Sequence, residues 1–109
     1  MNNVYIMSAN RSAIGGFGGT LKNHCPVDLG TLVAKEAIAR SGYEANEVEH
    51  AVFGNVIHTE PRDMYVSRVI ALQAGMDKSS AALTVNRLCG SGLQAIVSAY
   101  QIIMLGDAS

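Results

Sequence analysis

The sequence predicts an α/β fold in which parallel strands form a layer and helices pack on its faces. Compact apolar runs at residues 4–7, 50–57 and 81–85 have the composition of buried strands. A segment with helical periodicity follows each run, so strand and helix alternate along the chain. This order implies parallel strands joined by right-handed crossovers.

The first strand is predicted at residues 4–7, directly after the start of the chain. The connection that follows, residues 8–27, is longer than an ordinary strand-to-helix loop, which indicates a functional loop or one with local structure. Its glycine-rich centre, residues 15–19, has neither the GxGxxG spacing nor the Gly-Lys-Ser/Thr of a phosphate-binding loop. A turn-rich surface loop is the better interpretation.

The first helix is predicted between Asp28 and Gly42. Asp28 has a side chain suited to the N-cap, and Gly42 suits the position after the last helical turn. Apolar residues recur on one helical face between them, at Val33, Ala34, Ala37 and Ile38.

The second strand is predicted over residues 50–57, and Gly54 inside it marks a bulge or a close approach of another backbone. After a turn at residues 59–61, the second helix is predicted to begin near Asp63 and to end before Gly75.

The third strand, residues 81–85, and the helix predicted after Gly92 place Cys89 where a strand meets a helix. The unpaired N–H groups and the dipole of a helix N-terminus stabilise a thiolate, which is the reactive form of cysteine. Gly90 and Gly92 leave the sulfur uncrowded, so a thioester could approach it and its carbonyl oxygen could reach backbone N–H donors. Cys89 is therefore a candidate nucleophile, although an inert buried cysteine is the common alternative.

The uncharged residues 88–106 are numerous enough to raise the question of a membrane span. We interpret them as a core helix instead. Four polar residues recur along one stripe at helical spacing, and the rest of the surface is apolar, as in a helix buried inside a large protein. The stripe consists of Ser91, Gln94, Ser98 and Gln101.

Composition places the chain among soluble globular domains, with one domain at most. Its 109 residues carry a net charge of −1 and are 49% hydrophobic, a balance that argues against nucleic-acid or membrane-surface partners. The 2 cysteines do not make a disulfide framework, and no signal-peptide pattern opens the chain. A reducing, cytoplasmic location is the expected default.

Three blocks of the sequence resemble the thiolase family, the acyl-CoA C-acetyltransferases, and most of all the bacterial β-ketothiolases. Residues 85–95 read Val-Asn-Arg-Leu-Cys-Gly-Ser-Gly-Leu-Gln-Ala, like the family's nucleophile segment. Residues 11–19 are similar to the signature Arg-Thr-Pro-Ile-Gly-x-Phe-Gly-Gly, from which Ser12 and Ala13 depart. Residues 53–65 form the third block, and the three occur in the family's order.

The resemblance implies a thiolase-like layered fold. Residues 1–109 would form the N-terminal segment of its N-terminal domain, which is the first βαβαβα half. That half would be incomplete, and the C-terminal domain would be absent. Cys89 would hold the acyl group in a reversible Claisen condensation of acyl-CoA with acetyl-CoA, or in thiolysis of a 3-ketoacyl-CoA. The backbone N–H of Cys89 would contribute to an oxyanion hole. The resemblance implies no cofactor besides the coenzyme A thioester substrates, and a homodimer or homotetramer with residues 64–68 and 84–92 near the interface.

The resemblance also implies that this chain alone is inactive. Thiolases take a histidine and a second cysteine from Gly-His-Pro and Cys-x-Gly-Gly-Gly motifs, and neither motif occurs in the sequence. His24, His50 and His58 match no functional position, and we assign no role to Cys25. No residues have metal-ligand spacing, so we expect no bound metal.

Two alternative functions remain open at this point. A ketosynthase-type condensing enzyme, which takes acyl groups from a carrier protein, shares the general architecture and a cysteine at a helix start. The chain could also be a non-catalytic, truncated piece that contributes only structure or an interaction surface. We expect the isolated chain to be neither a catalyst nor a well-folded monomer.

Overall fold

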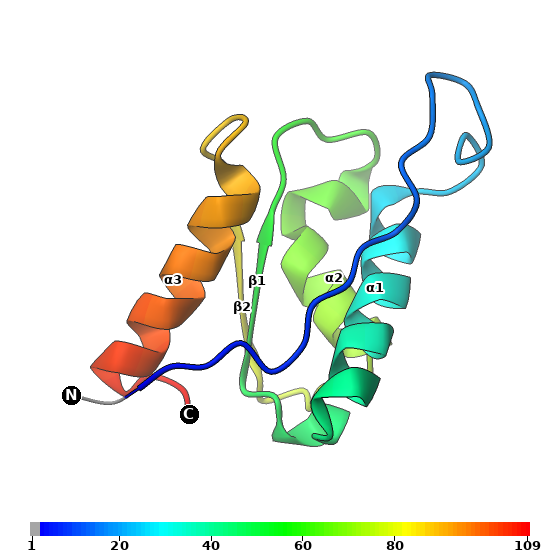
Figure 1. Ribbon diagram of the computed structural model, residues 1–109. Helices are drawn as coiled ribbons and strands as arrows, with labels where there is room; N and C mark the ends of the chain where they lie inside the picture. The colour runs from blue at the N-terminus through cyan, green and yellow to red at the C-terminus, as the bar shows by residue number, and fades with distance from the viewer. Residues whose placement is uncertain (1–2) are drawn as a thin grey trace.

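The computed structural model describes residues 3–109. Its elements follow one another in the order α1 (Pro26–Ser41), η1 (Ala45–Glu47), β1 (His50–Gly54), η2 (Pro61–Tyr65), α2 (Val66–Gln73), β2 (Ala81–Val85) and α3 (Ser91–Leu105), where η marks a short 3-10 helix. In Figure 1 the sheet lies between α3 on one side and the pair α1 and α2 on the other.

The sheet confirms the predicted α/β fold with parallel strands. β1 and β2 pair in parallel, in register from His50 with Ala81 to Gly54 with Val85. α2 lies between the two strands in sequence and packs on both, as a crossover helix does. The loops that follow β1 and β2 therefore lie at the same end of the sheet.

The predicted strand at residues 4–7 is wrong for the structure that residues 3–109 form. The segment makes no strand pairing there, because β1 and β2 pair only with each other. It is anchored to α1 by side chains that follow it: Ser8 Oγ donates to the Ala37 carbonyl at 2.7 Å, and Asn10 Nδ2 donates to the Val33 carbonyl at 3.1 Å. A run of β-like composition becomes a strand only when a neighbouring backbone accepts its hydrogen bonds.

The first helix begins before the predicted N-cap. Cys25, not Asp28, occupies the N-cap position of α1, and Pro26 follows it at the first helical position. Proline suits that position because its φ is already helical and its missing N–H would have no partner there. Asp28 lies in the first turn, where a carboxylate complements the helix dipole. Gly42 ends the helix as predicted, with a left-handed φ of +82°.

β1 is shorter than predicted. Of the two interpretations of Gly54, a bulge or a close approach of another backbone, the structure shows the close approach. A Cβ at Gly54 would lie 2.7 Å from the backbone carbon of Ser91, so only glycine lets α3 come this near. Beyond it the Asn55 N–H donates to the Val85 carbonyl at 3.0 Å, while the Asn55 side chain donates to the Asp63 carbonyl at 3.0 Å. The chain then bends away from the sheet.

The second helix starts at Val66, because the 3-10 turn η2 occupies its predicted first turn. Asp63 organises this turn from a fully buried position. Its Oδ2 accepts hydrogen bonds from the Thr59 N–H and hydroxyl, both at 2.7 Å, and from the Glu60 N–H at 3.2 Å. These bonds, the Thr59 hydroxyl first, lower the pKa of the Asp63 carboxyl below its ordinary value.

The core consists of small clusters on the α2 side of the sheet. The α1–α2 cluster contains Val27, Val66 and Ile70, and a second cluster contains Ala51, Ala71 and Met76. Phe53 of β1 packs against both. Burial is therefore concentrated on one face of the sheet.

α3 packs on the sheet through small side chains, and several of its large apolar side chains face outward. Ser91 and Ala95 are buried, whereas Leu93 is 70% and Ile96 58% exposed. Each large aliphatic side chain left in water forgoes ~1.5–3 kcal/mol of burial. Residues 3–109 therefore leave one face of this helix uncovered, as expected of a core helix of a larger protein whose remaining parts lie outside the chain. The segment Leu88–Leu105 is long and apolar enough to cross a membrane by length and composition only. Its mean hydropathy is 1.5, and 11% of its residues are buried.

Candidate functional site

Cys89 lies in the loop between β2 and α3, and its side chain is exposed. The loop extends from the carboxyl end of the strand, beside the loop that follows β1 (Figure 1). In open α/β sheets, ligands bind in the crevice outside the carboxyl ends of the strands. The predicted nucleophile therefore lies where the fold class places ligand sites.

The thiol precedes a helix N-terminus that has no side-chain cap. Gly90 is the N-cap of α3 and offers no side chain to the first N–H groups of the helix. Such groups have no partner within a helix and carry partial positive charge. The helix begins at Ser91, slightly earlier than predicted, and this brings its N-terminus closer to Cys89.

The loop around Cys89 is held by hydrogen bonds of two neighbouring side chains. Asn86 Oδ1 accepts from the Leu88 N–H at 3.0 Å. Ser91 Oγ accepts from the Arg87 N–H at 2.8 Å and donates to the Leu88 carbonyl at 2.7 Å. Leu88 itself has a left-handed φ of +48°, the one non-glycine residue with positive φ in the part of the chain described.

The histidines of the chain do not join Cys89. Among residues 3–109, no hydrogen bond links His24, His50 or His58 to its sulfur. His50 begins β1, at the opposite end of the strands, and its buried Nδ1 lacks a partner among the described residues. The same residues contain no group of His, Cys, Asp and Glu able to hold a metal ion.

Cys25 lies among acidic groups. It is half-buried beside the α1–α2 cluster, and Arg62 Nη2 lies 3.5 Å from its sulfur. The Asp28 backbone N–H favours the thiolate, but the hydrogen bond with the Asp28 carboxyl, partial burial, and the charges of Asp28 and Glu60 together raise the pKa of the Cys25 thiol above its ordinary value. This environment disfavours a nucleophilic thiolate.

Sequence reasoning missed the parts that Asn55, Asp63 and Ser91 play. Asn55 and Asp63 connect the two loops at the carboxyl end of the sheet, and Ser91 holds the loop of Cys89. Ser91 was assigned only to a polar stripe of a buried helix. A serine just after Gly90, with no capping residue before it, was the available signal.

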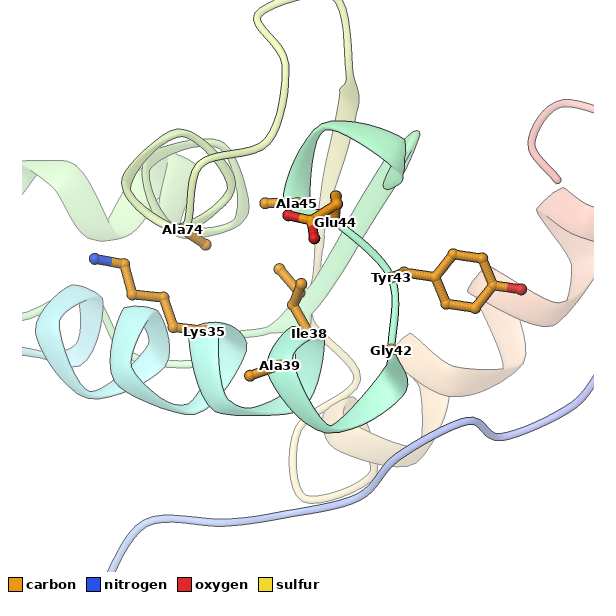
Figure 2. Close-up of a pocket in the computed structure, with 8 residues that line it drawn as sticks. All are labelled: Lys35, Ile38, Ala39, Gly42, Tyr43, Glu44, Ala45 and Ala74. Carbon is orange, nitrogen blue, oxygen red and sulfur yellow. The ribbon is translucent and has the colours of Figure 1, made fainter.

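Two hollows on the described surface lie away from Cys89. One of about 380 Å³ lies between the end of α1, η1 and Ala74, lined by Lys35, Ile38 and Tyr43 among others (Figure 2). Figure 2 shows the Tyr43 ring pointing away from Ile38. A larger one of about 620 Å³ lies near the amino ends of the strands, lined by His50 and by parts of the N-terminal segment and α3.

Comparison with known proteins gives consistent results. The sequence profile "Thiolase, N-terminal domain" matches residues 4–109. The chain is 60% identical to the beta-ketothiolase BktB of Cupriavidus necator over 104 residues, which cover 95% of the chain and 26% of that protein. The chain thus spans about a quarter of that relative's length.

Solved structures agree with the sequence comparison. An acetyl-CoA acetyltransferase from Bacillus anthracis superposes with a TM-score of 0.88 at 42% identity, over 94% of this chain and 26% of the other. The Acat5 thiolase from Ascaris suum, solved in complex with coenzyme A, superposes with a TM-score of 0.87 at 34% identity, again over 94% and 26%.

Proposed function

The chain belongs to the thiolase family, and from this premise we propose that it supplies the nucleophile segment of an acyl-CoA C-acetyltransferase, with Cys89 as the nucleophile. The proposed reaction is the reversible Claisen condensation of an acyl-CoA with acetyl-CoA, or thiolysis of a 3-ketoacyl-CoA. Relatives named as thiolases and acetyl-CoA acetyltransferases support this function over that of a ketosynthase.

One observation carries the proposal: an exposed thiol lies between the carboxyl end of a parallel strand and an uncapped helix N-terminus. An acyl-CoA thioester could approach the sulfur from solvent without moving a covering side chain. The N–H groups of Gly90 and Ser91 donate to the Arg87 and Leu88 carbonyls, both at 3.0 Å, so a developing oxyanion would have to be met by other N–H donors near the sulfur.

In the first step the acyl group moves from the sulfur of coenzyme A to the sulfur of Cys89. The Cys89 sulfur forms a bond to the acyl carbonyl carbon, the bond between that carbon and the coenzyme A sulfur breaks, and coenzyme A leaves as a thiolate that takes up a proton. The enolate of acetyl-CoA, or coenzyme A in the thiolytic direction, would then attack the acyl group on Cys89.

A base from outside residues 3–109 is required. A helix terminus stabilises a nearby anion by ~0.3–1 kcal/mol, whereas a tenfold change in the ratio of thiolate to thiol corresponds to ~1.4 kcal/mol. The dipole of α3 alone therefore activates the sulfur only slightly. The isolated chain should show no measurable thiolysis, and its exposed α3 face should prevent a cooperative monomeric melt in calorimetry.

We further propose assembly into a homodimer or homotetramer through residues 64–68 and 84–92. The exposed large side chains of these segments support the proposal, since Met64 is 60%, Tyr65 53% and Leu88 69% exposed. We also propose a cytoplasmic location, in keeping with the free state of Cys25 and Cys89, and no cofactor besides the coenzyme A thioesters.

The experiment that tests the function is acyl trapping. A polypeptide of the relatives' length that contains residues 1–109 is mixed with acetyl-CoA, quenched in acid, digested and analysed by mass spectrometry. The expected result is an acetyl group on the peptide that carries Cys89. Condensation activity with the acetyl group on Cys25, or with neither cysteine acetylated, would exclude the proposed mechanism.

A further inference from the structure

We propose that Ser91 is a positioning residue for Cys89: its hydroxyl fixes the loop that carries the sulfur and seats that loop on the sheet. The inference rests on the proposed function of Cys89 and extends it to a residue that touches neither substrate nor the reacting atoms.

The hydrogen bonds of Ser91 serve the loop and not the helix. A helix start is ordinarily capped by a side chain at the N-cap that accepts from N–H groups further along. In α3 that position is Gly90, and no side-chain cap is present. The Ser91 hydroxyl instead turns back, accepting from the Arg87 N–H at 2.8 Å and donating to the Leu88 carbonyl at 2.7 Å. The hydroxyl thus both accepts and donates a hydrogen bond, and both partners are residues just before Cys89.

These bonds hold Leu88 in a conformation that leucine does not favour. Its φ of +48° lies in the left-handed region, which is strained for a side chain with a Cβ. Asn86 Oδ1 accepts from the Leu88 N–H at 3.0 Å, and the Leu88 carbonyl accepts from both the hydroxyl and the N–H of Ser91. Since Leu88 directly precedes Cys89, its φ and ψ set the direction in which the cysteine leaves the loop.

The sheet fixes Ser91 in turn. Ser91 is only 5% exposed, and its backbone lies against Gly54 of β1. A Cβ at Gly54 would come within 2.8 Å of the Ser91 Cβ, so the contact leaves no space for a shift toward the strand. A continuous chain of contacts therefore runs from β1 through Ser91 and Leu88 to Cys89.

The test compares Ser91→Ala with Ser98→Ala in a polypeptide of the relatives' length. Ser98 is the matched control, because it lies on the same helix and its hydroxyl accepts from Gln94 Nε2 at 3.1 Å. Its link to the loop is indirect, through Gln94 Oε1, which accepts from Arg87. We expect Ser91→Ala to lower kcat, normalised to titrated active sites, about 10²-fold, as for a reacting group displaced by ~1 Å. KM should change less than about threefold, and Ser98→Ala should keep both constants.

A second readout removes the effect of partial unfolding. The rate constant for iodoacetamide labelling of Cys89, as distinct from the amount labelled, should fall about two- to fivefold in Ser91→Ala, because the sulfur is no longer held beside the helix N-terminus. Ser91→Thr, which keeps the hydroxyl, should recover most of the rate. Equal values for wild type and Ser91→Ala, or equal losses in Ser91→Ala and Ser98→Ala, would overturn the proposal.

A further variant covers the case in which Ser91 variants do not fold. Asn86→Ala releases the Leu88 N–H while leaving the contact of Ser91 with Gly54 intact, and it should slow labelling of Cys89 in the same direction. Unchanged labelling in that variant would count against the proposal. Labelling needs no acyl transfer, so a wild-type protein that labels as expected but transfers no acyl group would refute the proposed function alone.

Discussion

The two cysteines of the chain both lie at helix N-termini, yet their surroundings are opposite. Cys25 is the N-cap of α1, is half-buried against the α1–α2 cluster and has Asp28 and Glu60 for neighbours. Cys89 precedes the N-cap of α3 and is exposed. The acidic neighbours raise the pKa of Cys25, although the Asp28 backbone N–H acts against them.

The comparison shows that a helix N-terminus does not by itself make a nucleophile. The dipole contributes ~0.3–1 kcal/mol, and a single carboxylate nearby can offset that amount. What distinguishes Cys89 is access from solvent, a loop held by its own side chains, and a position at the carboxyl ends of the strands. Four experiments test this contrast between the two cysteines.

The largest expected effect is on acyl transfer. In a polypeptide of the relatives' length, Cys89→Ser should lower condensation activity by at least ~10³-fold, because a serine hydroxyl is far weaker as an unassisted nucleophile than a thiolate. Cys25→Ser is the matched control and should change activity less than about twofold. Steady-state assays with acetoacetyl-CoA measure both. A Cys89→Ser variant with wild-type activity would show that Cys89 is not the nucleophile.

A smaller effect is expected from the contact between β1 and α3. Gly54→Ala should destabilise the protein by about 1–3 kcal/mol, as overpacking does, because the added Cβ would overlap the backbone of Ser91. Gly92→Ala is the control, since a Cβ there meets no atom within 4 Å outside its chain neighbours and the backbone of its own helix. Denaturant unfolding of the two variants gives the difference. Equal midpoints would show that α3 can shift away from the strand freely.

Alkylation should then separate the two thiols directly. With iodoacetamide at neutral pH, Cys89 should react about tenfold faster than Cys25, because Cys25 is partly covered and its thiolate is disfavoured. Peptide mass spectrometry over time gives both rates. Preferential labelling of Cys25 would reverse the assignment.

The smallest effect concerns the acidic neighbour of Cys25. Its carboxyl raises the pKa of the Cys25 thiol, so Asp28→Asn should lower that pKa toward the ordinary value. At any pH below the raised pKa the thiolate fraction then increases, and alkylation of Cys25 should become a few times faster. The pH dependence of the rate checks the sign. A slower rate in Asp28→Asn would show that the carboxylate assists the thiol.

Elements whose limits are set by neighbouring residues in the sequence were predicted well. The strand at residues 81–85 and the helix after it were predicted nearly at their observed bounds, because a short apolar run, glycines and helical periodicity occur together there. Gly54 was correctly singled out as a candidate for close backbone approach. The start of α1 was missed because Pro26, a strong helix-start residue, was given less weight than Asp28.

Other features depended on partners that local patterns do not contain. Residues 4–7 have strand composition, but a strand exists only where another backbone pairs with it. The position of Cys89 followed from the junction of strand and helix, whereas the bonds of Ser91 required knowing that Leu88 turns left-handed. The role of Cys89 in catalysis stays a prediction.

The arrangement of α3, with small residues against the sheet and large apolar ones outward, has a consequence for biosynthesis. In a polypeptide of the relatives' length, the first quarter leaves the ribosome with Leu93, Ile96 and Leu105 facing water. At ~5–20 residues per second, synthesis of the remainder lasts on the order of tens of seconds. During that interval the apolar side chains of this helix face water, and slower translation downstream of it would lengthen the period in which nascent chains can aggregate.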